Sequence, residues 1–202
     1  MNPIETFVSR AVVLDRDDID TDQIIPARFL TTTGRSSLGE ALFADWRYDE
    51  AGAPRSDFPL NHSQRGAAIL IAGRNFGCGS SREHAVWALQ GYGLRAVIST
   101  QFADIFRTNA LGNGLLPITL EQDAYGVVLQ LCRDDPEAQL VVDLSAQTLT
   151  TPAGDRFEFP IDPFARHCLL QGTDALGYLL AAKDEITRYE LARATHLTEA
   201  RT

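Results

Sequence analysis

A segment rich in glycine, serine and arginine carries the residue types best suited to chemistry. It runs from Gly73 to His84 and reads GRNFGCGSSREH. Its two central glycines allow backbone conformations closed to other residues and let a second molecule approach closely. If a helix starts just after them, its free N–H groups and partial positive charge attract an anion. Together with Ser80, Ser81 and Arg82, this arrangement predicts a binding turn for a carboxylate or a phosphate.

The elements on either side must position this turn. Residues 67–72 are an unbroken apolar run, typical of a strand buried on both faces of a parallel sheet. Ser80 followed three residues later by Glu83 is a capping-box signature, which predicts that a helix begins there. Arg82 would then lie in the first helical turn. A cation is unfavourable there against the helix dipole, so its placement favours a partner anion.

The residue types of the turn leave two alternatives open. A plain strand-to-helix turn with a solvated arginine fits them equally well, and Cys78 between two glycines could supply a catalytic thiolate. The spacing G-x-x-x-G-x-G excludes a dinucleotide fingerprint, a P-loop and a nucleophile elbow. The residues therefore predict an anion-binding turn with two hydroxyls, without naming a reaction.

Composition limits the number of domains and the class of partner. A chain of 202 residues, 45% hydrophobic, suits one α/β domain with a smaller appendage. A net charge of -9 and a pI near 4.8 argue against nucleic acid or an anionic membrane surface as partner. Neither a membrane span nor a signal peptide is visible, which predicts a cytoplasmic protein. The three cysteines lack C-x-x-C spacing, so we expect no metal site within this chain.

Strand and helix patterns alternate around the central turn. Residues 7–14 have the pattern of a first strand, and apolar runs at 94–99 and 115–120 predict two further buried strands, with a helix over 102–111 between them. This alternation predicts a right-handed parallel βαβ array. Such sheets bind ligands beyond the carboxyl ends of their strands, where residues 77–82 fall.

The rest of the chain is expected to support this core. The patterns predict a helix, three short strands and two C-terminal helices, at 125–133, 140–144, 148–150, 156–159, 163–171 and 174–194. The last two strands form a hairpin. The predicted fold class is α/β with a mainly parallel central sheet, a small hairpin region, and C-terminal helices. Residues 1–162 form the main domain, and 163–202 form a helical extension packed on it.

Two polar stretches need separate explanations. Residues 15–22 place aspartates at alternate positions, but a calcium loop requires glycine where Gln23 stands and glutamate where Phe29 stands. Calcium is therefore excluded, and we expect a solvated turn followed by an extended segment at 24–26. Residues 31–64 are polar and irregular and contain three arginines. They predict either a cover over an acidic substrate or a surface excursion.

From Asn75 to His84 the sequence resembles the swivel domain of the aconitase superfamily. Four further motifs narrow the resemblance to the family of bacterial 3-isopropylmalate dehydratase small subunits. These motifs are DTDQIIP at 20–26, LFADWR at 42–47, FADIF at 102–106 and RHC at 166–168. The match runs over nearly the whole chain, and it implies a three-layer swivelling β/α domain.

The resemblance also implies a two-chain hydro-lyase. A separate large subunit would hold a 4Fe-4S cluster, and this chain would bind none. The family interconverts 2-isopropylmalate and 3-isopropylmalate through isopropylmaleate in leucine biosynthesis, so the expected partners are the large subunit and a small dicarboxylate. Two alternatives remain: a related small subunit acting on homoaconitate, citramalate or maleate, and a non-catalytic anion-binding swivel domain.

By position, the resemblance implies three roles in the central turn. Ser80 corresponds to the serine that removes the proton next to a substrate carboxylate, and Ser81 and Arg82 correspond to groups that hold a carboxylate. A helix terminus alone lowers the pKa of a hydroxyl by only about one unit. The rest of the activation must then come from a dry, closed site.

The resemblance assigns one more segment to the site. The loop at 31–39 is implied to lie near the variable end of the substrate, so Arg35 is expected to contribute to substrate binding and specificity. Asp20 and Asp22 are expected to order that loop and to take no part in the chemistry.

Overall fold

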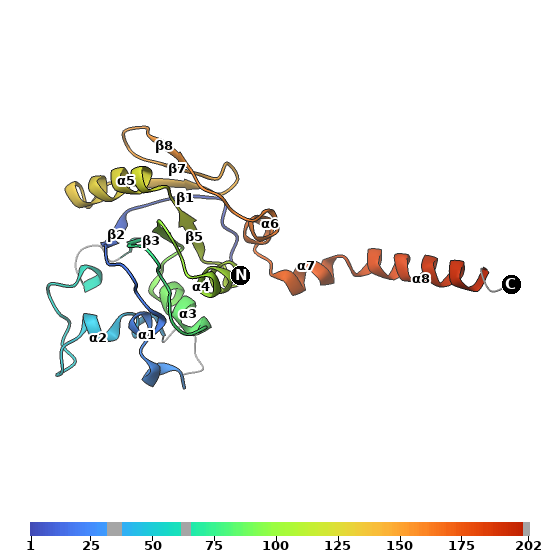
Figure 1. The fold of residues 1–202 in the computed structure, drawn as a ribbon, viewed down its shortest axis with the longest axis horizontal. Coiled ribbons are helices and arrows are strands. Elements are labelled where there is room, and N and C mark those ends of the chain that lie inside the picture. The colour runs from blue at the N-terminus through green and yellow to red at the C-terminus, as the bar shows by residue number, and fades with distance from the viewer. Residues whose placement is uncertain (32–37, 62–65, 200–202) are drawn as a thin grey trace.

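A four-stranded parallel sheet lies at the centre of the computed structural model, which describes residues 1–31, 38–61 and 66–199 (Figure 1). The strands are β2 (Ala11–Leu14), β3 (Ile69–Ala72), β4 (Ala96–Ser99) and β5 (Leu116–Thr119), in the order β2-β3-β4-β5. Every residue of β3 and β4 is buried, because both faces of the sheet are covered. The predicted parallel array is therefore confirmed.

Helices cover one face of this sheet. They are α1 (Thr21–Ile24), α2 (Ala44–Arg47), α3 (Glu83–Tyr92) and α4 (Asp104–Asn113), with 3-10 turns η1 (Ala27–Phe29) and η3 (Pro59–Asn61) nearby. Side chains alternate along a strand. Leu70 and Val97 therefore share one core cluster with Val86 and Leu89 of α3, while Ile69 and Ile71 point to the other face.

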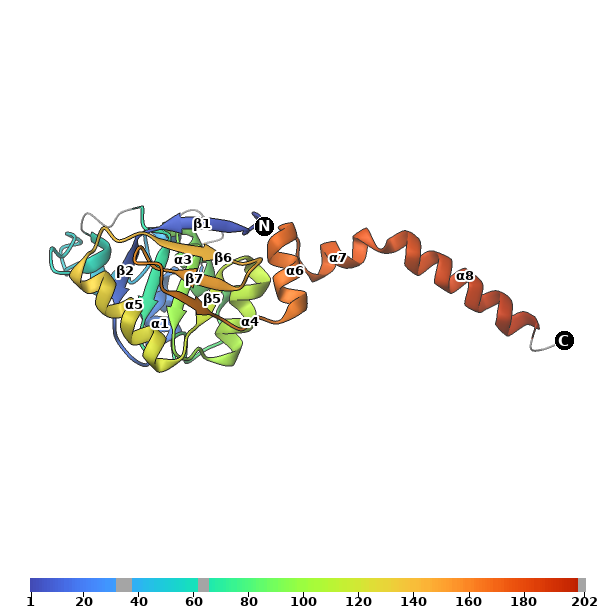
Figure 2. The ribbon, with the colours of Figure 1, turned by 90° about the horizontal axis from the view of Figure 1, so that it is seen from above.

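The opposite face is covered by one helix and a second sheet. The helix is α5 (Gln122–Asp134), and the antiparallel strands are β1 (Thr6–Ser9), β6 (Leu140–Asp143), β7 (Thr148–Thr150) and β8 (Arg156–Glu158), in the order β1-β6-β7-β8. Their buried side chains join Ile69 and Ile71 in a second core cluster. Figure 2 shows the second sheet and α5 side by side. The predicted layered fold and hairpin are confirmed.

The predicted single strand over 7–14 is wrong, because the chain changes sheets at Arg10. Ser9 ends β1 in the antiparallel sheet, and Ala11 begins β2 in the parallel sheet. The Ser9 hydroxyl accepts from the N–H of Ala68 at 2.7 Å and donates to the carbonyl of Arg10 at 2.8 Å. This pair of hydrogen bonds stabilises the corner, which the strand-forming residues on both sides do not reveal.

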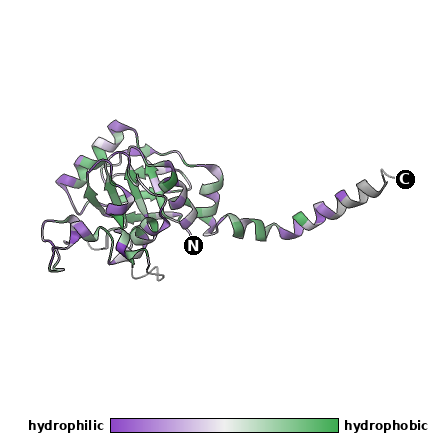
Figure 3. Cartoon of the chain, turned by 60° about the horizontal axis from the view of Figure 1, so that its bottom comes forward, coloured by the Kyte–Doolittle hydropathy of each residue, from purple (hydrophilic) through white to green (hydrophobic). Residues whose placement is uncertain are grey.

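The C-terminal segment begins against the core and then leaves it. In α6 (Pro163–Gln171), Cys168 and Leu169 are buried. The predicted helix over 174–194 is two helices, α7 (Ala175–Ala181) and α8 (Lys183–Glu199), which lead away from the core (Figures 1 and 2). Figure 3 shows hydrophobic residues gathered in the central strands and on α7. None of the described helices has the length and apolar composition needed to cross a membrane.

Candidate active site

The side chain of Phe76 anchors the turn between β3 and α3 in the core. Phe76 is fully buried, and its ring meets that of Phe106 edge-on, with the centroids 5.1 Å apart. Gly77 has φ +78°, and a Cβ there would lie 2.2 Å from the Phe106 ring. Only glycine fits this position. The following residues are thereby held at the carboxyl end of β3, as predicted for a ligand site in a parallel sheet.

A second support is the acidic segment at 15–22, which runs alongside the turn. The N–H of Gly77 donates to the carbonyl of Ile19 at 2.7 Å. Carboxylates serve the same purpose, because Asp17 accepts from the N–H of Arg74 at 2.7 Å and Asp18 accepts from the Asn75 amide at 2.8 Å. Residues 15–18 form the expected exposed turn, and the segment adds one isolated parallel bridge between Asp20 and Cys78. In the parts of the chain that the structure describes, no group of three or more His, Cys, Asp or Glu side chains could hold a metal ion.

This segment ends in the well-capped helix α1. Asp20 accepts at Oδ1 from the N–H groups of Asp22 at 2.6 Å and Gln23 at 3.0 Å, and the Gln23 side chain accepts from the N–H of Asp20 at 3.0 Å. This is a complete capping box. The predicted extended segment at 24–26 is therefore wrong at Ile24, which belongs to α1. The Asp-x-x-Gln signature was present in the sequence and would have revealed the helix.

Helix α3 begins differently from the prediction, and the proposed capping box of Ser80 and Glu83 is wrong. The N-cap is Arg82, in an extended conformation, and no side chain caps the helix. The cause lies in the carbonyl of Ser80, which accepts from the Thr21 hydroxyl at 3.0 Å and from the N–H of Arg82 at 2.8 Å. These bonds keep residues 80–82 out of the helix. Arg82 therefore precedes the first helical turn.

The structure brings five of the predicted site residues to one place. Ser80 and Ser81 are exposed, and neither hydroxyl has a hydrogen-bond partner among the described residues. A terminal guanidinium nitrogen of Arg82, Nη1, pairs with Oδ1 of Asp22; the two side chains are 21% and 50% exposed. Asp20 caps the helix that carries Asp22. The two aspartates thus contact the turn at 78–82, and the sixth predicted residue, Arg35, lies outside the described residues.

Thr21 belongs to the same site and was missed by sequence reasoning. Its side chain is buried. Its N–H donates to the carbonyl of Cys78 at 2.9 Å, and its hydroxyl donates to the carbonyl of Ser80 at 3.0 Å. The signal available in the sequence was its place directly after the helix cap, but nothing in the sequence shows that α1 and the turn are neighbours.

Cys78 is held as a neutral thiol. Burial raises its pKa above the ordinary value, and the negative charges of Asp20 and Asp18 raise it further. Its Sγ donates to the carbonyl of Asp18 at 3.4 Å. A raised pKa leaves little thiolate at neutral pH, so the surroundings of Cys78 do not favour a nucleophile.

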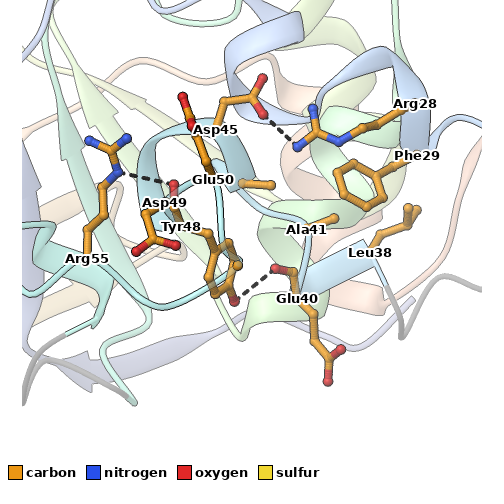
Figure 4. A pocket seen from close by; sticks show the side chains of 12 residues that line it. Arg28, Phe29, Leu38, Glu40, Ala41, Asp45, Tyr48, Asp49, Glu50 and Arg55 are labelled. Atoms are coloured by element: carbon orange, nitrogen blue, oxygen red, sulfur yellow. Dashed lines mark hydrogen bonds and ion pairs between the residues drawn. The ribbon is translucent and has the colours of Figure 1, made fainter.

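A cavity of about 760 Å³ lies beside α2, away from residues 80–82 (Figure 4). Arg28 and Asp45 form an ion pair of 2.6 Å in its wall, and Arg55 donates from Nε to the carbonyl of Tyr48 at 3.1 Å. Nearby, Arg47 is only 3% exposed and donates to backbone carbonyls of residues 39, 40 and 42. Arg47 therefore stabilises its own segment and is too deeply buried to contact a substrate in this cavity.

Comparison with known proteins places this geometry in a family. A family model described as the aconitase C-terminal domain matches residues 1–123, and one described as LeuD_N matches residues 128–163. The chain is 55% identical to the 3-isopropylmalate dehydratase small subunit of Roseiflexus castenholzii, covering 95% of each chain. It is also 55% identical to that of Anaeromyxobacter dehalogenans, covering 96% of this chain and 100% of the relative.

A solved structure agrees with these relatives. The crystal structure titled 3-isopropylmalate dehydratase from Methanocaldococcus jannaschii is 29% identical, with a TM-score of 0.65, covering 91% of this chain and 99% of that one. The likeness therefore extends from sequence to fold. On this evidence the chain belongs to the family of 3-isopropylmalate dehydratase small subunits, and its first 123 residues match the aconitase C-terminal domain.

Proposed function

We propose that this chain is the catalytic small subunit of a two-chain hydro-lyase that isomerises 2-isopropylmalate and 3-isopropylmalate through isopropylmaleate in leucine biosynthesis. Full-length relatives with that name support the proposal. The observation that carries it is the exposed turn of Ser80, Ser81 and Arg82 at the carboxyl edge of a parallel sheet. Its hydroxyls are free of partners among the described residues and open to a substrate.

In this proposal each residue of the turn has one task. Ser80 removes the proton next to a substrate carboxylate, a step that requires its own hydroxyl proton to have been lost first, and its backbone carbonyl is fixed by two hydrogen bonds. Arg82 pairs with that carboxylate, and Ser81 donates a hydrogen bond to it. The uncapped start of α3 adds partial positive charge at the same place. Arg35 contributes to specificity at the variable end of the substrate.

The free chain is not expected to hold an active base. Ser80 is exposed to water, and a helix terminus contributes roughly 0.3–1 kcal/mol, at most about 2, toward an anion. One pKa unit corresponds to about 1.36 kcal/mol. Ser80 lies two residues before the N-cap Arg82, so the dipole contributes less than this limit, and far less than ionising the hydroxyl requires. The remaining stabilisation has to come from closure of the site by another chain, which excludes water and strengthens each charge interaction.

The proposal assigns the 4Fe-4S cluster to the large subunit. The residues that this structure describes do not fit a cluster, because they contain no group of ligands that could hold a metal. Cys132 and Cys168 are buried and belong to α5 and α6, and Cys78 lies in the turn. In this proposal, the tasks of this chain are proton transfer and carboxylate binding. A cytoplasmic location and a small dicarboxylate substrate are parts of the same proposal.

The test is reconstitution with a cluster-loaded large subunit. Turnover is measured with 2-isopropylmalate, homoaconitate, citramalate and maleate, using each subunit alone as control. We expect turnover only in the mixture, with the highest kcat/KM for isopropylmalate. Preference for another acid would assign the chain to a related hydro-lyase. Absence of turnover with any of the four, despite complex formation and an intact cluster, would contradict the catalytic role.

A further inference from the structure

We propose that Asp22 is a positioning residue for substrate binding: it holds one arm of the Arg82 guanidinium so that the other edge is presented to the substrate carboxylate. The proposal rests on the carboxylate-binding role of Arg82 proposed above. It gives Asp22 a task different from the one predicted from sequence, which was to order the loop at 31–39. The contact that suggests it joins Oδ1 of Asp22 to Nη1 of Arg82.

Asp22 is suited to this task because it is itself held. It lies on α1, and its N–H donates to Oδ1 of Asp20 at 2.6 Å inside the capping box. The neighbouring Thr21 is hydrogen-bonded to the backbone of the turn through both its N–H and its hydroxyl. The carboxylate therefore projects from a short rigid element that is tied to the same turn as its partner. Groups supported in this way hold a binding geometry better than groups on a loop.

The chemistry of the guanidinium explains why one arm can be occupied. The group is planar and carries five N–H donors, and a carboxylate needs only two of them in a parallel pair. Among the described residues, Asp22 is the partner of Arg82, and it engages Nη1 alone. The edge formed by Nη2 and Nε is left for a second carboxylate. Fixing the plane beforehand reduces the side-chain entropy lost when substrate binds.

Competition between Asp22 and the substrate for Arg82 would change KM in the opposite direction. If Asp22 competed with the substrate for Arg82, removing its carboxylate would free the guanidinium and lower KM. If Asp22 positions Arg82, removing it lets the side chain sample other rotamers and raises KM. With an ordering cost of the size usual for a long side chain, we expect KM to rise about five- to tenfold, with kcat close to the wild-type value.

The experiment uses the reconstituted two-subunit enzyme with Asp22→Ala and Asp22→Asn. The matched control is Glu137→Gln, which removes the ion pair with Arg10, where the arginine and glutamate are 25% and 68% exposed. KM should rise in both Asp22 variants and stay unchanged in the control. Thermal unfolding midpoints show that each variant is folded, and Asp22→Asn keeps the size of the side chain should Asp22→Ala fold poorly. An unchanged or lowered KM would overturn the proposal.

A double-mutant cycle separates positioning from general loosening of the turn. Because Asp22 is proposed to act only through Arg82, Asp22→Ala should have no further effect on KM in an Arg82→Ala background. A further rise there would mean that Asp22 acts through the fold, and the proposal would fail. The cycle also tests the proposed carboxylate-binding role of Arg82. If Arg82→Ala leaves KM unchanged, the carboxylate role itself is wrong, whereas an effect of Arg82→Ala without one of Asp22→Ala sinks only the positioning role.

Discussion

Two helices meet at the turn after β3, and their first residues differ sharply. The N-terminus of α1 is capped by side chains, since Asp20 and Gln23 form a complete capping box. Helix α3 follows its N-cap Arg82, and no side chain caps it. Uncapped N–H groups are costly only when they are dry, and this turn is exposed. The difference teaches that the capped end stabilises the turn, while the open end is available to an incoming anion.

The sharpest test of this contrast is Ser80→Ala at the open end. General-base groups contribute roughly 10²–10⁴-fold to rate, so kcat of the reconstituted enzyme should fall by about this factor. The side chain is exposed and without a partner among the described residues, so the thermal unfolding midpoint should stay the same. Steady-state kinetics and a thermal melt provide both readouts. Turnover like that of the wild type would contradict the role of the serine.

The next variant, Arg82→Lys, keeps the charge and removes the planar fork. Hydrogen bonds to charged groups contribute roughly 1.5–3 kcal/mol, so losing one of the pair should raise KM about tenfold or more. We expect kcat to change much less than KM. Substrate titration of the assembled enzyme measures the split. A KM equal to the wild-type value would argue that Arg82 serves only its ion pair with Asp22.

Thr21 links the capped helix to the open one, and a pair of variants tests this link. Thr21→Val keeps the shape and removes the hydroxyl that donates to the Ser80 carbonyl, whereas Thr21→Ser retains that donor. We expect Thr21→Val to lower kcat several-fold and to cost about 1 kcal/mol of unfolding free energy. Thr21→Ser should recover most of the rate. Equal rates in the two variants would show that the hydroxyl does not position the serine.

At the capped end, the main effect should be on stability. Asp20→Ala removes the acceptor for two N–H groups and should cost roughly 0.5–2 kcal/mol, which denaturant titration can measure. Asp20→Asn restores a capping oxygen and is the conservative comparison. Asp174→Ala is the matched control, because it removes the cap of α7, a helix with no buried residue. A global destabilisation by Asp174→Ala as large as that by Asp20→Ala would contradict the interpretation.

The smallest effect is expected for Cys78→Ala, between the two ends. Burial and the nearby charges of Asp20 and Asp18 raise the pKa of the thiol, so it stays protonated well above neutral pH. Kinetic constants should remain near their wild-type values, and alkylation of Cys78 by iodoacetamide should accelerate only at alkaline pH. Rapid alkylation at pH 7 together with loss of turnover would assign this cysteine a reactive role.

The layered fold could be predicted because its signal is local and strong. The buried strands at 69–72 and 96–99 are unbroken apolar runs, and the helices that follow them end at Gly93 and Gly114, both with positive φ. The corner at Arg10 could not be predicted, since both flanking segments have strand-forming residues and the two sheets are told apart only by long-range pairing.

The turn lies where the sequence placed it, at the end of β3, but its contacts could not be predicted. The glycines and hydroxyls at 77–81 identified the turn, but the capping pattern at Ser80 was misleading because the bond from Thr21 comes from a segment 59 positions away in the chain. A local sequence motif contains no information about a hydrogen-bond donor that is distant in the chain. The same limit applies to Asp22 and Arg82, which are 60 positions apart and meet only because α1 lies along the turn.

The corner at Ser9 and Arg10 has a mechanical consequence. A single residue separates a strand of the outer sheet from a strand paired with β3, whose end carries the turn. Because no flexible linker separates the two sheets, a force applied to the amino terminus is transmitted through β1 directly into β2, the strand paired with β3. A large rotation of this chain against a partner is therefore expected to move both sheets together, and the Ser80 hydroxyl would move with them as part of the same unit.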